Sequence, residues 1–132
     1  MRTQILSQLD IYRGIFQTAC KYDWDKVRSV ASEYLETIER LAPDLLTEMR
    51  GIVDGLRIPE VDVVDIIALN ARSEIALGQW DDGCTALSWK LENKQLLAQN
   101  WDWRTSVGNN LALASIQQEG KPDIWQIIEV QS

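Results

Sequence analysis

The 132-residue chain contains no histidine, only two cysteines, and no apolar run near the roughly 18–20 residues that cross a bilayer. Without histidine, a nucleophilic side chain lacks its usual imidazole base. The same absence, with two distant cysteines, excludes common zinc sites. Cys20 and Cys84 are too few for a disulfide framework and indicate free thiols in a reducing compartment. We therefore expect no metal and no other cofactor.

Basic residues are also scarce, with 13 Lys and Arg against 20 Asp and Glu and a formal charge of −7. Phosphate binding needs clustered cations, so we expect neither a nucleic-acid partner nor an anionic membrane partner. The mixed amphipathic start is unlike a signal peptide, and the last three residues, VQS, form no recognisable targeting tripeptide. By default, this predicts an intracellular, cytoplasmic protein.

The first half of the chain has the apolar periodicity of helices. Four apolar residues recur at that spacing near the start: Ile5, Leu9, Tyr12 and Phe16. Asp23 is a candidate N-cap for one long amphipathic helix that reaches Leu41. Pro43 suits the first turn of another helix, Pro59 breaks that helix, and a last helix is expected over 61–77.

After a turn-like connector at 78–83, the pattern becomes that of short strands. Strands are expected over 84–89, 95–101, 111–117 and 124–130. The sequence therefore predicts an α+β fold in one partial domain over residues 1–132. Its helical segment covers 1–83, and its antiparallel strands occupy 84–132.

One four-stranded sheet would have two faces, and the helices can cover only one of them. The other face would carry Leu97, Leu113 and Ile127, with nothing left in the chain to cover it. This pattern predicts an incomplete fold or association with another chain.

The pair Gly83-Cys84 offers a chemistry that needs no histidine. Because Gly83 has no side chain, its carbonyl, which precedes Cys84, is open to attack by the thiol. The attack would shift the acyl group from nitrogen to sulfur and, after hydrolysis, free a new N-terminus. That α-amine, with a pKa of about 7.7–8.0, can serve as the base for the thiol. Asp102, 18 residues further on, could lie beside Cys84 if the first two strands form a hairpin, and could orient the amine.

Two runs at this spacing, DGCT at 82–85 and AQNWDW at 98–103, closely resemble the fungal acyl-coenzyme A:6-aminopenicillanic acid (isopenicillin N) acyltransferase family. The upstream runs EMRGI at 48–52 and ALNARSE at 68–74 are similar to the helical segments of that family. The resemblance covers roughly residues 22–130.

The resemblance implies an N-terminal-nucleophile hydrolase with an αββα sandwich, self-cleaved into a short α and a long β subunit. It implies acyl transfer or amide hydrolysis through an acyl-cysteine thioester. Gly83–Cys84 would be the autocleavage bond, Cys84 the nucleophile and Asp102 the catalytic acidic residue. The implied substrates are a small-molecule acyl donor, with acyl-CoA as one candidate, and an amine acceptor. Intact relatives can be peroxisomal.

Family members continue far beyond the 48 residues that follow Cys84 here. The second sheet and a downstream Asn and Arg of the active site would be missing, so we expect the isolated chain to be a truncated, inactive member. Whether it is an enzyme stays open. The alternative is a non-catalytic fragment or interaction module, and a third reading is that a separate chain supplies the absent sheet.

The same residues also have non-catalytic explanations. Cys84 could be a buried structural thiol, and Asp102 a strand-end carboxylate. Cys20, in a helical context, is expected to be structural. The tryptophans of the second half could line an acyl pocket, although most are expected to pack between sheet and helices: Trp80, Trp89, Trp101, Trp103 and Trp125.

Overall fold

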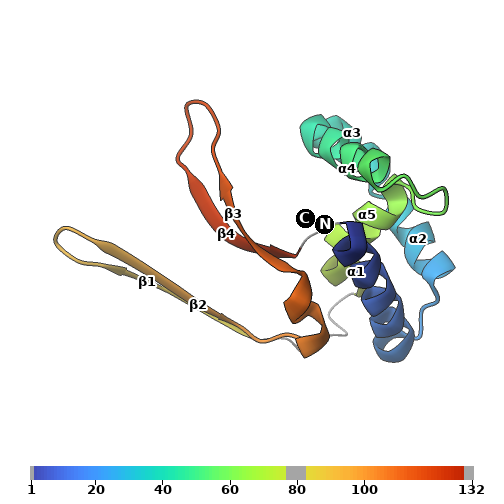
Figure 1. Cartoon of the computed structure of the whole chain (residues 1–132), viewed down its shortest axis with the longest axis horizontal. Helices are drawn as coiled ribbons and strands as arrows, with labels where there is room; N and C mark the ends of the chain where they lie inside the picture. Colours follow the sequence, from blue (N-terminus) through green and yellow to red (C-terminus); the bar gives the residue numbers. More distant parts are fainter. Residues whose placement is uncertain (1, 77–82, 130–132) are drawn as a thin grey trace.

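A computed structural model describes residues 2–76 and 83–129 of the chain (Figure 1). The helices are α1 (Arg2–Ile15), α2 (Trp24–Ser32), α3 (Leu35–Leu41), α4 (Pro43–Leu56), α5 (Val63–Asn70) and α6 (Arg72–Ala76), with a π-helical turn η1 (Phe16–Cys20) after α1. The strands are β1 (Cys84–Lys90), β2 (Gln95–Trp101), β3 (Leu111–Ile116) and β4 (Ile124–Glu129), with a 3₁₀ helix η2 (Thr105–Asn110) between β2 and β3. This order confirms the predicted α+β class. No helix in the described ranges is long and apolar enough to cross a bilayer.

Side-chain caps and a proline define three of the helix starts. The Asp23 side chain accepts a hydrogen bond from the Lys26 N–H at 2.8 Å, which confirms the predicted N-cap of α2. Pro43 occupies the first turn of α4, as predicted. At α5, Asp62 and Asp65 form a reciprocal capping box, which the sequence interpretation did not identify.

Two of the predicted helices are shorter than expected. The helix predicted to reach Leu41 ends at Ser32, where the N–H groups of Glu33 and Tyr34 bond three residues back instead of four. This turn redirects the chain from α2, which packs on α5, to the peripheral α3, which buries none of its residues. The helix predicted over 61–77 is likewise divided at Ala71 into α5 and α6, and residue 77 lies outside the described residues.

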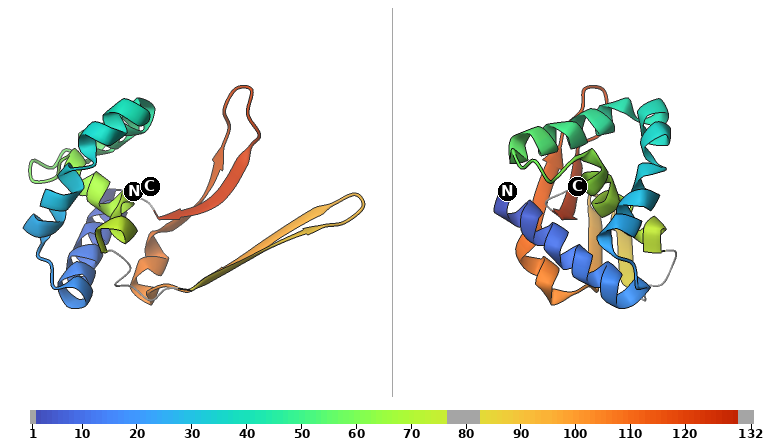
Figure 2. Two further views of the ribbon diagram at one scale, coloured as in Figure 1. Left: turned by 180° about the vertical axis from the view of Figure 1, so that it is seen from behind. Right: turned by 90° about the vertical axis from the view of Figure 1, so that its right-hand side faces the viewer.

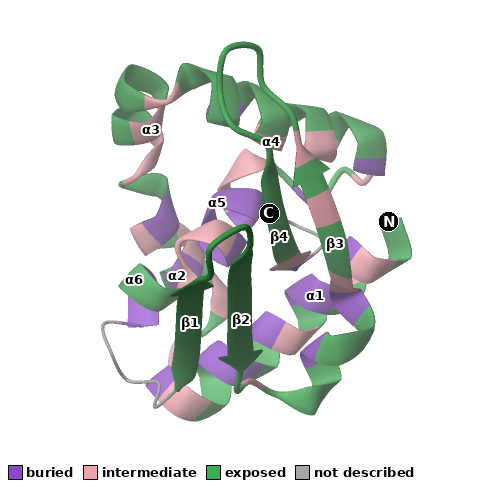
Figure 3. Ribbon diagram, turned by 90° about the vertical axis from the view of Figure 1, so that its left-hand side faces the viewer, coloured by how far each residue is buried: buried purple, intermediate pink, exposed green. Residues whose placement is uncertain are grey.

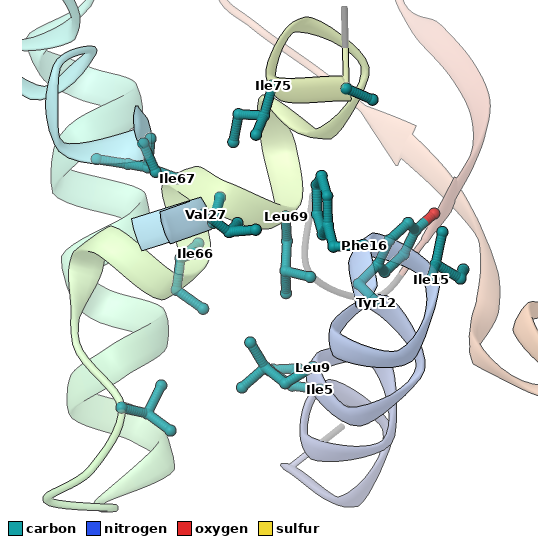
Figure 4. Packing of buried hydrophobic residues seen from close by; sticks show 14 of the residues in the cluster. Ile5, Leu9, Tyr12, Ile15, Phe16, Val27, Ile66, Ile67, Leu69 and Ile75 are labelled. Atoms are coloured by element: carbon teal, nitrogen blue, oxygen red, sulfur yellow. The ribbon is translucent and has the colours of Figure 1, made fainter. Parts of the chain in front are cut away.

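In the described part of the chain, the hydrophobic core cluster is built by the helices and the segments that connect them (Figure 4). Helix α5 is its centre, because Ile66, Ile67 and Leu69 are fully buried. Leu9 of α1 and Val27 of α2 pack into the same cluster. Burying one such side chain contributes about 1.5–3 kcal/mol relative to leaving it exposed. The helices therefore have a substantial core of their own.

The strands form two separate antiparallel hairpins, not the predicted four-stranded sheet. β1 pairs with β2, and β3 pairs with β4. The 3₁₀ helix η2 turns the chain between β2 and β3, and the two hairpins diverge from there (Figures 1 and 2). The prediction that helices cover one sheet face is wrong for the first hairpin, since every residue of β1 and β2 is exposed (Figure 3).

The uncovered apolar residues predicted from the sequence are indeed exposed. Leu97, Leu113 and Ile127 are 77%, 68% and 65% accessible to solvent. The prediction that most tryptophans pack inside is wrong for Trp89, Trp101 and Trp125, whose hairpins have no layer over them. It is confirmed for Trp103, which packs against the helical core. Trp80 lies outside the described residues.

Candidate functional site

The β1–β2 hairpin brings Gly83, Cys84 and Asp102 together. Cys84 opens β1 and pairs with Trp101, the last residue of β2. One step further along the ladder, the Asp102 N–H donates a hydrogen bond to the Gly83 carbonyl oxygen at 3.3 Å. The pairing on which the Asp102 prediction depended is therefore present. The catalytic roles of the three residues stay predictions.

The junction is open to solvent. Gly83, Cys84 and Asp102 are all exposed, so the reading of Cys84 as a buried structural thiol is wrong. A Cβ built on Gly83 would meet nothing within 4 Å, so the space beside the Gly83 Cα is open. Cys20, by contrast, is buried in the helical core, as a structural thiol should be.

The motif around Asp102 also holds the start of β1. The Asn100 side-chain oxygen accepts a hydrogen bond from the Thr85 N–H at 2.7 Å. Thr85 and Asn100 are also register partners in the ladder. The residues on either side of Cys84 are thus both hydrogen-bonded to the 98–103 run. The two runs therefore meet across the β1–β2 ladder.

A buried polar cluster behind this junction was missed by the sequence interpretation. We call it the Glu129 cluster, and its members are Gln8, Tyr12, Arg72, Trp103, Asn110 and Glu129. The Tyr12 hydroxyl lies 3.0 and 3.1 Å from the two carboxylate oxygens of Glu129. Arg72 lies 3.0 Å from the same carboxylate, and Gln8 also donates to it. The cluster links α1 and α6 to the end of β4.

The cluster continues towards the candidate site. The Trp103 indole N–H donates to the Tyr12 hydroxyl at 3.1 Å, and Asn110 of η2 donates to the Gln8 side chain at 2.7 Å. Burial raises the pKa of Tyr12 above its ordinary value, with Arg72 opposing and Glu129 adding to that rise. Tyr12 therefore stays neutral and keeps its hydroxyl proton. The sequence did hold a signal, since Gln8 interrupts the apolar stripe of α1 one turn before Tyr12.

A second polar cluster lies within the helices. Arg28 forms ion pairs with Asp62 at 2.7 Å and with the buried Asp65 at 2.5 Å. The Trp24 indole N–H donates to Asp65 at 2.8 Å. These contacts join α2 to the start of α5. Because they bind the helical core together and none involves residues 83–102, we interpret them as structural.

An open groove of about 930 Å³ lies between the two hairpins. Its walls are mainly apolar and include Leu97, Leu113 and Ile127, while Arg72 and Glu129 contribute charged groups. Trp101, the register partner of Cys84, also lines it. The groove therefore extends towards the Gly83–Cys84 junction and offers a surface for an apolar group.

The chain is similar in sequence to a known acyltransferase. No protein-family model matches the chain. The acyl-coenzyme A:6-aminopenicillanic-acid-acyltransferase 40 kDa form of Emericella nidulans is 31% identical over 128 residues. The match covers 96% of this chain but 35% of the relative, so the chain spans about a third of that protein's length. Similarity extends across both the helices and the hairpins.

Proposed function

This chain is a partial member of the acyl-coenzyme A:6-aminopenicillanic-acid acyltransferase family, and from that premise we propose that Gly83–Cys84 is a self-cleavage site whose cleavage frees Cys84 as a nucleophile. The observation that carries the proposal is the hydrogen bond from the Asp102 N–H to the Gly83 carbonyl oxygen, at 3.3 Å. A donor on that oxygen polarises the carbonyl that the thiol must attack.

The cleavage proceeds in two balanced steps. The Cys84 sulfur attacks the Gly83 carbonyl carbon, negative charge develops on the oxygen that Asp102 N–H holds, and the Gly83–Cys84 C–N bond breaks. The nitrogen takes up the thiol proton, leaving a Gly83 thioester on the cysteine sulfur and a free α-amine. Water then hydrolyses the thioester, giving the Gly83 carboxylate and a free thiol. The net reaction is the addition of one water across the peptide bond.

After cleavage, Cys84 carries its own base. The α-amine, with a pKa of about 7.7–8.0, accepts the thiol proton as the sulfur attacks an acyl donor. The Asp102 carboxylate is our candidate for orienting the resulting ammonium. The acyl group then resides on Cys84 as a thioester, and it passes to an amine or to water.

A thiol nucleophile with an adjacent amine base can take an acyl group from a thioester or from an amide. The name of the Emericella nidulans relative specifies an acyl-coenzyme A and 6-aminopenicillanic acid, and we propose the broader class of acyl thioester donors and amine acceptors for this chain. The apolar groove between the hairpins offers a surface for the acyl group. Because Cys84 and Asp102 are exposed, water competes with any amine, and we expect transfer to amines to be inefficient in the isolated chain.

Mass spectrometry of the purified chain tests the cleavage proposal. The sequence alone led us to expect an inactive chain, but the Asp102 N–H on the Gly83 carbonyl oxygen leads us to expect two products that meet at Gly83–Cys84. We expect one uncut product from a Cys84→Ala variant. Incubation of the cut protein with a short acyl-CoA should add one acyl group to Cys84, which hydroxylamine removes. Cleavage that persists in Cys84→Ala would refute the assignment of the nucleophile.

A second candidate is a non-catalytic interaction module. The exposed apolar residues Leu97, Leu113 and Ile127 favour it, since such faces commonly bind another polypeptide. We propose that another polypeptide binds this exposed apolar surface and covers the strands. An intact mass for the purified chain, together with no acylation of Cys84, would favour this second function over the first.

A further inference from the structure

The β1–β2 hairpin has no packed face to orient it. Every residue of β1 and β2 is exposed, including the large side chains of Leu87 and Trp89. A hairpin without a buried face is only marginally stable in water and is held mainly by whatever fixes its ends. The Gly83–Cys84 junction lies at one of those ends, because Cys84 is the first residue of β1.

The other strand of the hairpin is anchored just after Asp102. Trp103 packs against the helical core and donates its indole N–H to Tyr12 at 3.1 Å. Four residues beyond it, Val107 of η2 is buried, and Asn110 bonds to Gln8. The chain therefore leaves the exposed hairpin and enters the helical body at Trp103.

The direction of each hydrogen bond is determined by the donors available. An indole N–H can only donate, so the Tyr12 oxygen must accept from Trp103. Tyr12 has a single proton, and that proton is directed to Glu129 at 3.0 Å. Arg72 balances the carboxylate charge, also at 3.0 Å.

We propose that Tyr12 and Glu129 are positioning residues for self-cleavage, because through Trp103 they hold the Asp102 N–H on the Gly83 carbonyl oxygen. The effect on cleavage rests on the proposed function, whereas the positioning of the Asp102 N–H is a property of the uncut chain. Neither residue touches the reacting atoms. Their effect is to keep the donor at the oxygen on which charge develops.

Amide hydrogen exchange measured by NMR tests the positioning directly. The measurements are made in a Cys84→Ala chain, which cannot be cut at this cysteine. Tyr12→Phe and Trp103→Phe each remove one hydrogen-bonding group while keeping most of the side-chain volume. We expect each to speed exchange of the Asp102 amide about tenfold more than exchange of the buried Leu69 amide, which reports global opening.

Trp24→Phe is the matched control. It removes an indole N–H that donates to Asp65 at 2.8 Å, within the helices. It should leave exchange of the Asp102 amide unchanged, because that amide exchanges by opening of the exposed hairpin, and it should speed exchange of the Leu69 amide only as far as it lowers global stability. If Tyr12→Phe and Trp103→Phe likewise leave the Asp102 amide unchanged, or change both amides equally, the positioning proposal is overturned.

Cleavage kinetics of the chain with Cys84 present give the second measurement. Tyr12→Phe and Trp103→Phe should slow cleavage about tenfold, as expected for a lost or misplaced donor, while Trp24→Phe should leave the rate unchanged. Unchanged rates in the first two variants would overturn the proposal. If the parent chain is not cut at all, the proposed function fails, while the exchange comparison still decides whether Tyr12 holds the junction.

Discussion

The Asp102 N–H lies 3.3 Å from the Gly83 carbonyl oxygen, although 18 residues separate the two in the chain. The β1–β2 ladder creates this contact, because Cys84 pairs with Trp101 and the next pair follows in register. The contact joins the two sequence runs on which the family resemblance rests. It also places a hydrogen-bond donor on the one carbonyl that the Cys84 thiol would have to attack.

Gly83→Ala should slow cleavage without changing the stability of the fold. A Cβ at this position meets nothing within 4 Å, so urea unfolding should give a free energy within about 0.5 kcal/mol of the parent chain. Cleavage should nevertheless slow, because the methyl group lies beside the carbonyl under attack. A large loss of stability would contradict the open environment described for Gly83.

Asp65→Asn should strongly destabilise the helices. Asp65 is 1% exposed and pairs with Arg28 at 2.5 Å. The change removes one of the two carboxylates that pair with Arg28, so the free energy of unfolding should fall by about 2–3 kcal/mol. Asp62→Asn is the matched control, because Asp62 is largely exposed and Asn is also a good N-cap, and it should cost about 1 kcal/mol or less. Equal losses in urea unfolding would contradict this assignment.

The Asp62 carboxyl should make stability depend on pH. Its hydrogen bond with Arg28 holds the pKa of Asp62 below its usual range. A carboxyl whose pKa is lower in the folded state contributes stability above its unfolded pKa, about 3.9, and loses it as pH falls through the folded value. The difference in unfolding free energy between the parent and Asp62→Asn should therefore shrink from pH 7 to pH 3. A difference that stays constant would contradict the ion pair.

A pair of leucines tests where the stabilising core lies. Leu69→Ala removes a fully buried side chain from α5 and should cost about 3 kcal/mol. Leu97→Ala removes one that is 77% exposed and should change stability by no more than about 0.5 kcal/mol. Chemical denaturation of both variants makes the comparison. A large effect of Leu97→Ala would indicate that the hairpin is buried in solution.

The local features of the fold were predictable from the sequence. Asp23 and Pro43 carry local start signals, and the alternating strands have clear turns between them. The break after Ser32 was not predictable, because residues 33–34 carry no glycine or proline. Strand pairing beyond each hairpin was also not predictable, since local pattern indicates strands but not which of them share a sheet.

The candidate site also contains residues that were predictable from the sequence and residues that were not. Gly83, Cys84 and Asp102 could be found because their spacing is local to one hairpin. The Glu129 cluster could not, because Tyr12 and Glu129 are 117 residues apart and meet only through tertiary packing. Gln8 in an apolar stripe was the one available sign of a buried polar contact.

Self-cleavage at Gly83–Cys84 is tested most directly by the intact mass of the purified 132-residue chain beside that of its Cys84→Ala variant. We expect two fragments from the parent, ending at Gly83 and beginning at Cys84, and a single uncut chain from the variant. A parent chain that stays whole, or a variant that is still cut at this bond, would contradict this expectation.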